Sequence, residues 1–166
     1  EAMLPTVPKQ QDWSALAYRW DTQTRSLIPI FYPQQLDANL LLGVERQKQE
    51  LERNTQQFLA GLPANNALLW GARGTGKSSL IKALLSRYAE QGLRIVEVDR
   101  SELSDLARIV EPLRSRPERF ILFCDDLSFE ADDPSYKALK AAIEGSIAAP
   151  PENVLIYASS NRQHLL

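Results

Sequence analysis

The sequence contains a single cysteine, Cys124, and a single histidine, His164. One thiol cannot form a disulfide within the chain, and a structural zinc site needs several Cys or His ligands at short spacings. Both an internal disulfide and such a zinc site are therefore excluded. We expect Cys124 to be a small core residue, and we do not expect the lone His164 to act as a catalytic base.

Long apolar runs and an excess of basic residues are also missing. No run approaches the ~20 apolar residues of a membrane helix, and the chain does not start with a basic segment followed by an apolar one. We therefore expect no membrane span, no signal peptide and a cytoplasmic location. The 19 basic and 21 acidic residues give a net charge of −2, which does not indicate nucleic-acid binding. A local basic patch remains open, because net charge does not report how charges are distributed.

What the sequence does contain is the composition of a globular domain, with 44% hydrophobic and 24% charged residues. We expect residues 1–43 to be irregular, apart from a short helix over 13–20. Apolar residues then recur at helical spacings from residue 44 to residue 62. Strand-like and helix-like segments alternate beyond that point. The expected strands are 67–70, 93–98, 120–124 and 154–158, and the expected helices are 77–89, one capped by Ser101 that runs to residue 113, and one that starts at Asp133-Pro134.

Each of these strands is an almost continuous apolar run, and amphipathic helices separate them. Strands of this kind are buried on both faces, as in a parallel sheet between two layers of helices. The crossovers between such strands are right-handed. The sequence therefore predicts a three-layer α/β fold, in which ligands bind at the carboxyl ends of the strands.

A glycine-rich loop follows the first of these strands. It reads Gly71-Ala72-Arg73-Gly74-Thr75-Gly76-Lys77-Ser78, which fits the P-loop pattern G-x-x-x-x-G-K-[ST] at every fixed position. Glycines allow backbone N–H groups to point inward at a triphosphate, and the following helix adds its N-terminal N–H groups and dipole. The alternative is a flexible glycine turn with an incidental lysine.

The chemistry of this pattern predicts binding of ATP with Mg²⁺. Lys77 is expected to reach the β- and γ-phosphates, and the Ser78 hydroxyl to bind Mg²⁺. Ser79 completes the predicted nucleotide-binding segment.

Two aspartates follow the strand over residues 120–124. Asp125 is expected to hold Mg²⁺, directly or through a water molecule. Asp126 is then placed to polarise the attacking water, although its side chain is one methylene shorter than the glutamate that many P-loop ATPases use. Glu130 is an alternative for that role. A further alternative is that the paired acids merely end a buried strand at the surface.

The strand over 154–158 also leads into polar residues, Ser159-Ser160-Asn161. The amide of Asn161 both donates and accepts hydrogen bonds, so it suits a position between the γ-phosphate and the water held by the acid. An ordinary polar turn is the alternative. Arg162 has two interpretations, contact with a phosphate or a neighbouring subunit, and plain solvation.

Together these motifs resemble those of AAA+ ATPases, in which a Walker A loop, a Walker B acid and a sensor 1 asparagine follow one another in this order. More narrowly, the chain from about Trp13 onward resembles an uncharacterised bacterial family of predicted AAA+ ATPases. The segments that carry this resemblance are 54–66, 68–80, 120–130 and 153–165.

The resemblance implies a P-loop sheet with the strand order 5-1-4-3-2. It also implies that Leu42-Gly43-Val44 packs around adenine, with ordinary core packing of Leu42 and Val44 as the alternative. The Asp125-Asp126 pair is similar to the Walker B motif of bacterial replication initiators and helicase loaders, where it supports ATP hydrolysis.

AAA+ proteins continue past sensor 1 into a fifth strand, an arginine finger and a helical lid, and we expect none of these in this chain. The expected organisation is an irregular arm over 1–40 and an AAA+ core over 41–166 that is truncated at its C-terminus. Because an arginine finger is worth ~10³ to 10⁵ in rate in related hydrolases, we expect this chain alone to hydrolyse ATP slowly, if at all.

Three functions fit these observations. The first is a motor or switch ATPase that works as a homo-oligomer with ATP at subunit interfaces. The second is a non-hydrolysing adaptor or loader, acting on DNA or a partner protein, in which nucleotide occupancy alone biases a conformation. The third is a small-molecule kinase, which would need an acceptor pocket and an arginine-bearing lid. The sequence indicates neither.

Overall fold

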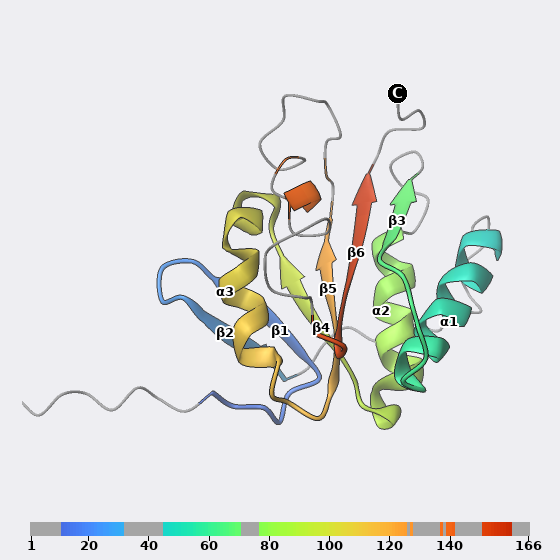
Figure 1. The fold of residues 1–166 in the computed structure, drawn as a ribbon, viewed down its shortest axis with the longest axis horizontal. Coiled ribbons are helices and arrows are strands. Elements are labelled where there is room, and N and C mark those ends of the chain that lie inside the picture. The colour runs from blue at the N-terminus through green and yellow to red at the C-terminus, as the bar shows by residue number, and fades with distance from the viewer. Residues whose placement is uncertain are drawn as a thin grey trace, which may run out of the picture.

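The computed structural model of the protein describes residues 11–31, 45–70, 77–125, 127, 137, 139–141 and 151–160. A six-stranded sheet in the order β2-β1-β4-β5-β6-β3 forms the centre of this part of the chain (Figure 1). The strands are β1 (Ala17–Asp21), β2 (Ser26–Ile30), β3 (Ala67–Trp70), β4 (Leu93–Val98), β5 (Arg119–Cys124) and β6 (Val154–Ser160). All neighbouring strands pair in parallel except β1 and β2, which form an antiparallel hairpin.

Helices cover both faces of the sheet. α1 (Glu45–Leu59) and α2 (Lys77–Tyr88) lie on one side, and α3 (Leu106–Val110) lies on the other (Figure 1). Each layer buries its own core. The core beneath α1 and α2 includes Leu51, Leu84 and Ile121, and the core beneath α3 includes Val96, Ile109 and Leu122. The predicted three-layer α/β fold is therefore confirmed.

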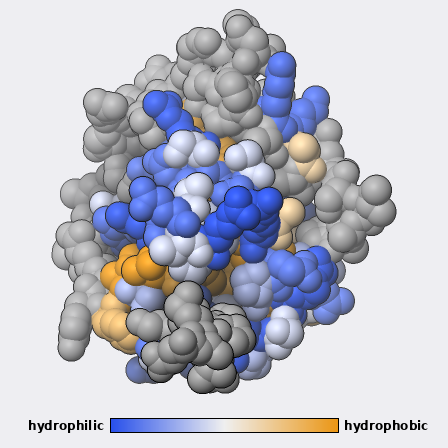
Figure 2. Space-filling view, turned by 90° about the vertical axis from the view of Figure 1, so that its left-hand side faces the viewer, coloured by the Kyte–Doolittle hydropathy of each residue, from blue (hydrophilic) through white to orange (hydrophobic). Residues whose placement is uncertain are grey.

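The outer surface on the α3 side is largely hydrophilic, with a smaller hydrophobic area beside residues that the structure does not describe (Figure 2). This distribution fits an amphipathic outer layer, whose polar face meets water. None of the described helices is long and apolar enough to cross a membrane.

The order of the four predicted strands is also confirmed. In chain order, β3, β4, β5 and β6 are the first to fourth strands of the expected P-loop sheet. They lie side by side as 1-4-3-2, which is the expected order without its fifth strand. Apolar runs made these strands easy to predict, and the central strands β5 and β6 are buried along almost their whole length.

The hairpin β1–β2 corrects the prediction that residues 17–30 are irregular and that 13–20 form a helix. Tyr18 and Trp20 are buried while Arg19 between them is exposed, which is the two-residue period of a strand. The spacing of Trp13 and Trp20 also fits a helix, but Trp13 instead packs edge-on against Tyr18, with ring centroids 5.9 Å apart. The predicted domain boundary at residues 40 and 41 lies outside the described residues and stays a prediction.

The segment after β4 also differs from its prediction. Its cap is Asp99 rather than Ser101, because Asp99 accepts from the Ser101 amide at 3.1 Å and Glu102 accepts from the Asp99 amide at 3.0 Å. The expected single helix is divided into α3 and two 3₁₀ helices, Arg100–Asp105 and Glu111–Leu113. Pro112 contributes to this division, because it has no N–H group for an α-helical hydrogen bond.

A polar network fixes the loop between α1 and β3. The Asn54 side chain donates to the Asn65 carbonyl at 2.7 Å and accepts from the Asn65 amide at 2.9 Å. The buried hydroxyl of Tyr157, on β6, lies 3.0 Å from Asn54 Nδ2 and 2.8 Å from Thr55 Oγ1. The start of β3 is thereby held in position against β6, the strand that leads to Asn161.

We expect Tyr157→Phe to lower the free energy of unfolding by about 1–2 kcal/mol, because the buried amide and hydroxyl lose their common partner. Chemical denaturation measures this change. Tyr88→Phe is the matched control, since Tyr88 is equally aromatic and buried but its hydroxyl accepts a hydrogen bond from the exposed Gln56, at 3.0 Å. A loss at Tyr157 no larger than the loss at Tyr88 would contradict the role of this network.

Candidate functional site

The predicted phosphate loop connects the end of β3 to the start of α2. β3 ends at Trp70 and α2 begins at Lys77, so Lys77 and Ser78 are the first two residues of the helix. No acidic residue lies in the first turn of α2. The strand–loop–helix context that a phosphate loop requires is therefore present.

Several predicted site residues fall outside the part of the chain that the structure describes. These residues are Val44, Gly71, Ala72, Arg73, Gly74, Thr75, Gly76, Asp126, Glu130, Asn161 and Arg162. Their assignments remain predictions. The described positions are Lys77, Ser78 and Ser79 at the start of α2, and Asp125 after β5.

The sheet brings the ends of three strands together. β5, β6 and β3 are neighbours and run in parallel, so their carboxyl ends lie at the same edge of the sheet (Figure 1). The register pairs Trp70 with Ser160 and Cys124 with Ala158. Each of the three predicted motifs begins directly after one of these strands in the sequence. Because the three strands are neighbours, the motifs begin close together.

Asp125 is tied to the neighbouring strand β6. Its carboxylate is exposed, and its Oδ1 accepts a hydrogen bond from Ser159 Oγ. Two residues further on, the Leu127 amide donates to the Ser159 carbonyl at 2.8 Å. The chain on both sides of Asp126 is therefore fastened to β6.

The donor types at this edge suit magnesium. Carboxylate and hydroxyl oxygens are ligands for Mg²⁺, which keeps several waters and takes one or two carboxylates together with phosphates. Among the described residues, no three His, Cys, Asp or Glu side chains gather into a group that would hold a metal by themselves. Asp125 fits the part of a single protein carboxylate in such a site.

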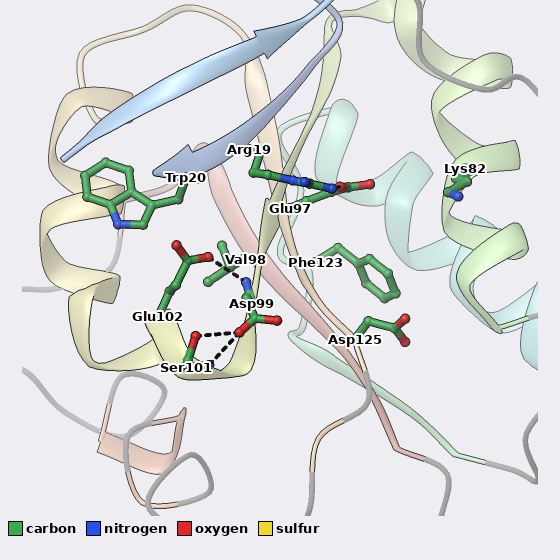
Figure 3. Close-up of a pocket in the computed structure, with 10 residues that line it drawn as sticks. All are labelled: Arg19, Trp20, Lys82, Glu97, Val98, Asp99, Ser101, Glu102, Phe123 and Asp125. Atoms are coloured by element: carbon green, nitrogen blue, oxygen red, sulfur yellow. Dashed lines mark hydrogen bonds and ion pairs between the residues drawn. The ribbon is translucent and has the colours of Figure 1, made fainter. Parts of the chain in front are cut away.

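A cavity of about 550 Å³ opens beside Asp125, at the carboxyl ends of β1, β4 and β5 (Figure 3). Its charged lining residues are Arg19, Lys82, Glu97, Asp99, Glu102 and Asp125. No sequence motif predicts this cavity, because Arg19 reaches it only through the pairing of β1 with β4.

The acidic residues around this cavity already have partners. Glu97 forms an ion pair with Arg19 at 3.2 Å, and Glu102 accepts from Thr22 Oγ1 at 2.7 Å. Hydrogen bonds from Ser101 lower the pKa of Asp99 below its usual value. Glu97 therefore joins β1 to β4, Glu102 joins the hairpin to the segment after β4, and Asp99 caps that segment. The cavity does not by itself identify an acceptor site.

Cys124 precedes Asp125 but has no place in the chemistry. The side chain is fully buried, and burial raises the pKa of its thiol to about 12. The thiol therefore stays protonated near neutral pH, where a thiolate would be the reactive form. The prediction that Cys124 is a core residue is confirmed.

The fold is shared with proteins of known structure. The chain is similar to the Orc1 protein of Aeropyrum pernix, solved in complex with DNA, with a TM-score of 0.54 and 18% identity. The match covers 76% of this chain and 43% of that chain. PCH-2 of C. elegans matches with a TM-score of 0.53 and 20% identity over 73% of this chain and 38% of that one. The chain thus spans less than half the length of these structures.

Likeness at this identity shows the fold alone, and that fold is the AAA+ type of P-loop α/β sheet expected above. No curated protein matches the sequence. A family model described as "Protein of unknown function (DUF815)" matches residues 13–166, nearly the whole sequence. The chain therefore belongs to the DUF815 family and has an AAA+-type P-loop fold.

Proposed function

We propose that this chain binds ATP with Mg²⁺ through residues 71–78, and that the complete protein is a magnesium-dependent ATPase. The observation that supports this most strongly is the meeting of β5, β6 and β3 at one edge of an AAA+-type sheet. The sequence G-x-x-x-x-G-K-S connects β3 to α2 at that edge. Asp125 follows β5, which is the second strand along from β3 in the sheet.

The proposed roles follow from the charge of a triphosphate. The amides at the start of α2 and the helix dipole attract the phosphates. Lys77 neutralises charge on the β- and γ-phosphates, while Ser78 and Asp125 hold the metal side of the site. Mg²⁺ held by Ser78 and Asp125 would supply positive charge to offset the negative charge that develops during phosphoryl transfer.

Hydrolysis in this proposal depends on two further residues. Asp126 polarises the attacking water by accepting a hydrogen bond from it. The water's oxygen bonds to the γ-phosphorus while the bond from that phosphorus to the oxygen bridging the β- and γ-phosphates breaks, so that ADP leaves, and the water's proton passes to Asp126 and then to phosphate. The Asn161 amide orients that water relative to the γ-phosphate. Val44, with Leu42 and Gly43, contacts the adenine.

For the complete protein, we propose a cytoplasmic homo-oligomer in which hydrolysis drives a conformational switch on a protein or DNA client. The test measures the size of the full-length protein with and without ATP and Mg²⁺, and assays phosphate release in the same samples. The expected result is assembly with ATP and Mg²⁺ and release of phosphate. ATP with EDTA is the control and is expected to give neither.

Measuring ATP affinity and phosphate transfer to metabolites as well separates the alternatives. Tight ATP binding without turnover, even with candidate partners, would favour the non-hydrolysing adaptor or loader. Phosphate transfer to a metabolite instead of water would favour a kinase. Absence of both ATP binding and turnover would contradict the proposal.

A further inference from the structure

Ser159 occupies an unusual place for a buried serine. It is the second-last residue of β6, is 1% exposed, and directs its hydroxyl at the exposed carboxylate of Asp125. Since an unpaired buried hydroxyl costs free energy, this hydrogen bond to a charged acceptor is strongly favoured. The bond joins two residues that are 34 positions apart in the sequence.

We propose that Ser159 is a positioning residue that holds Asp125 in the orientation required for magnesium. The proposal rests on the ATP and Mg²⁺ site proposed above. It assigns Ser159 no contact with the metal or the nucleotide. Ser159 acts through Asp125, as the hydrogen-bonding partners of metal ligands do in many metal sites.

The geometry explains why Asp125 needs such a partner. Asp125 is the first residue after β5 and is exposed, so a hydrogen bond to its carboxylate restricts the rotamers of its side chain. The Ser159 hydroxyl donates to Oδ1. A carboxylate has several lone-pair sites, so this hydrogen bond does not prevent the same group from binding a metal or a water bound to it.

The backbone of Ser159 strengthens this arrangement. Its carbonyl accepts the Leu127 amide at 2.8 Å, so one residue holds the segment 125–127 through both its side chain and its main chain. Ser159 also lies two residues before Asn161. The Ser159 side chain therefore joins Asp125, the proposed magnesium ligand, to the strand that leads to the predicted sensor residue Asn161.

Neighbouring Ser160 provides a control of matched size and burial. It is fully buried, but side chains alternate along a strand, so it points to the opposite face of the sheet. The experiment uses full-length protein and the variants Ser159→Ala, Ser159→Thr and Ser160→Ala. Calorimetry measures ATP affinity once with Mg²⁺ and once with EDTA, so that the gain in affinity from the metal is obtained separately.

We expect Ser159→Ala to bind ATP in EDTA with the affinity of the wild type. The factor by which Mg²⁺ increases ATP affinity is expected to be about 10- to 100-fold smaller in this variant, which is the usual effect of mutating a hydrogen-bonding partner of a metal ligand. Ser159→Thr retains the hydroxyl and is expected to recover most of the gain, while Ser160→Ala is expected to keep it. Thermal unfolding confirms that each variant is folded. If Ser159→Thr is not folded, the comparison of the two alanine variants decides.

The inference would be overturned if Ser159→Ala kept the full gain from Mg²⁺, or if Ser160→Ala lost as much. Equal losses would show a general disturbance of the strand end. These outcomes differ from failure of the proposed function, in which the wild-type protein itself would bind no ATP under either condition.

Discussion

Replacing Asp126 with asparagine in the full-length protein is expected to reduce ATP hydrolysis by about 10²- to 10⁴-fold, the usual contribution of a positioned acid–base group. Binding of ATP and Mg²⁺ should be retained, because the amide keeps the shape of the side chain and Asp125 is unchanged. Steady-state phosphate release and ATP affinity, measured on the same preparation, test both parts of this expectation.

The residues on either side of Asp126 are held on β6. Asp125 and Leu127 are both hydrogen-bonded to Ser159. The role of Asp126 stays a proposal, and the rate of the Asp126→Asn variant tests it.

Glu130→Gln is the matched control for this experiment. It makes the same change from acid to amide in the alternative candidate, and it is expected to leave most of the hydrolysis rate intact. A wild-type rate in Asp126→Asn would show that the assignment is wrong. Loss of activity in Glu130→Gln alone would transfer the role to Glu130.

Replacing Lys77 with alanine is expected to weaken ATP binding by about 30-fold or more. Truncating one member of a desolvated, hydrogen-bonded charge pair costs roughly 2–5 kcal/mol, and each 1.4 kcal/mol is tenfold in affinity. Lys77 is the first residue of α2, where its ammonium group and the helix dipole act on the same anion. Titration with a fluorescent ATP analogue measures the loss.

Lys82→Ala separates a specific effect at Lys77 from a general effect of charge. Lys82 lies on the same helix but further from its N-terminus, and it lines the cavity beside Asp125. We expect less than about a threefold change in affinity, because Lys82 lies beyond the first turn of α2, to which the effect of the helix N-terminus is confined. Equal losses in the two variants would argue against a phosphate loop that depends on Lys77.

The core of the fold was predictable because its strands are unambiguous. Residues 120–124 are wholly apolar and residues 93–98 are apolar except for the half-buried Arg94 and Glu97, and both segments form strands in the structure. The left-handed conformation of Gly92, with φ 98°, ends the turn after α2.

The β1–β2 hairpin could not be recognised in the same way. Five-residue strands provide few positions for testing a period, and Trp13 and Trp20 are also spaced as on a helix. What decides the outcome is the pairing of Ala17 with Ile95 on β4, a contact between residues far apart in the chain. Local preferences do not contain such a contact.

The candidate site likewise has a part that the sequence predicts and a part that depends on contacts between distant residues. Its motifs are local patterns, so the roles of Lys77, Ser78 and Asp125 could be predicted from the sequence. The bond between Ser159 and Asp125 was not, because it depends on the register of β5 against β6, which pairs Cys124 with Ala158. The ion pair of Arg19 with Glu97 was missed for the same reason, since it depends on the pairing of β1 with β4.

The most direct test of the account is a calorimetric titration of the folded full-length protein with ATP in the presence of Mg²⁺. The account predicts saturable binding heat at one site per chain, with weaker binding when EDTA removes the metal. Absence of binding heat with any purine nucleoside triphosphate and Mg²⁺ would contradict the assignment of residues 71–78 as a phosphate loop.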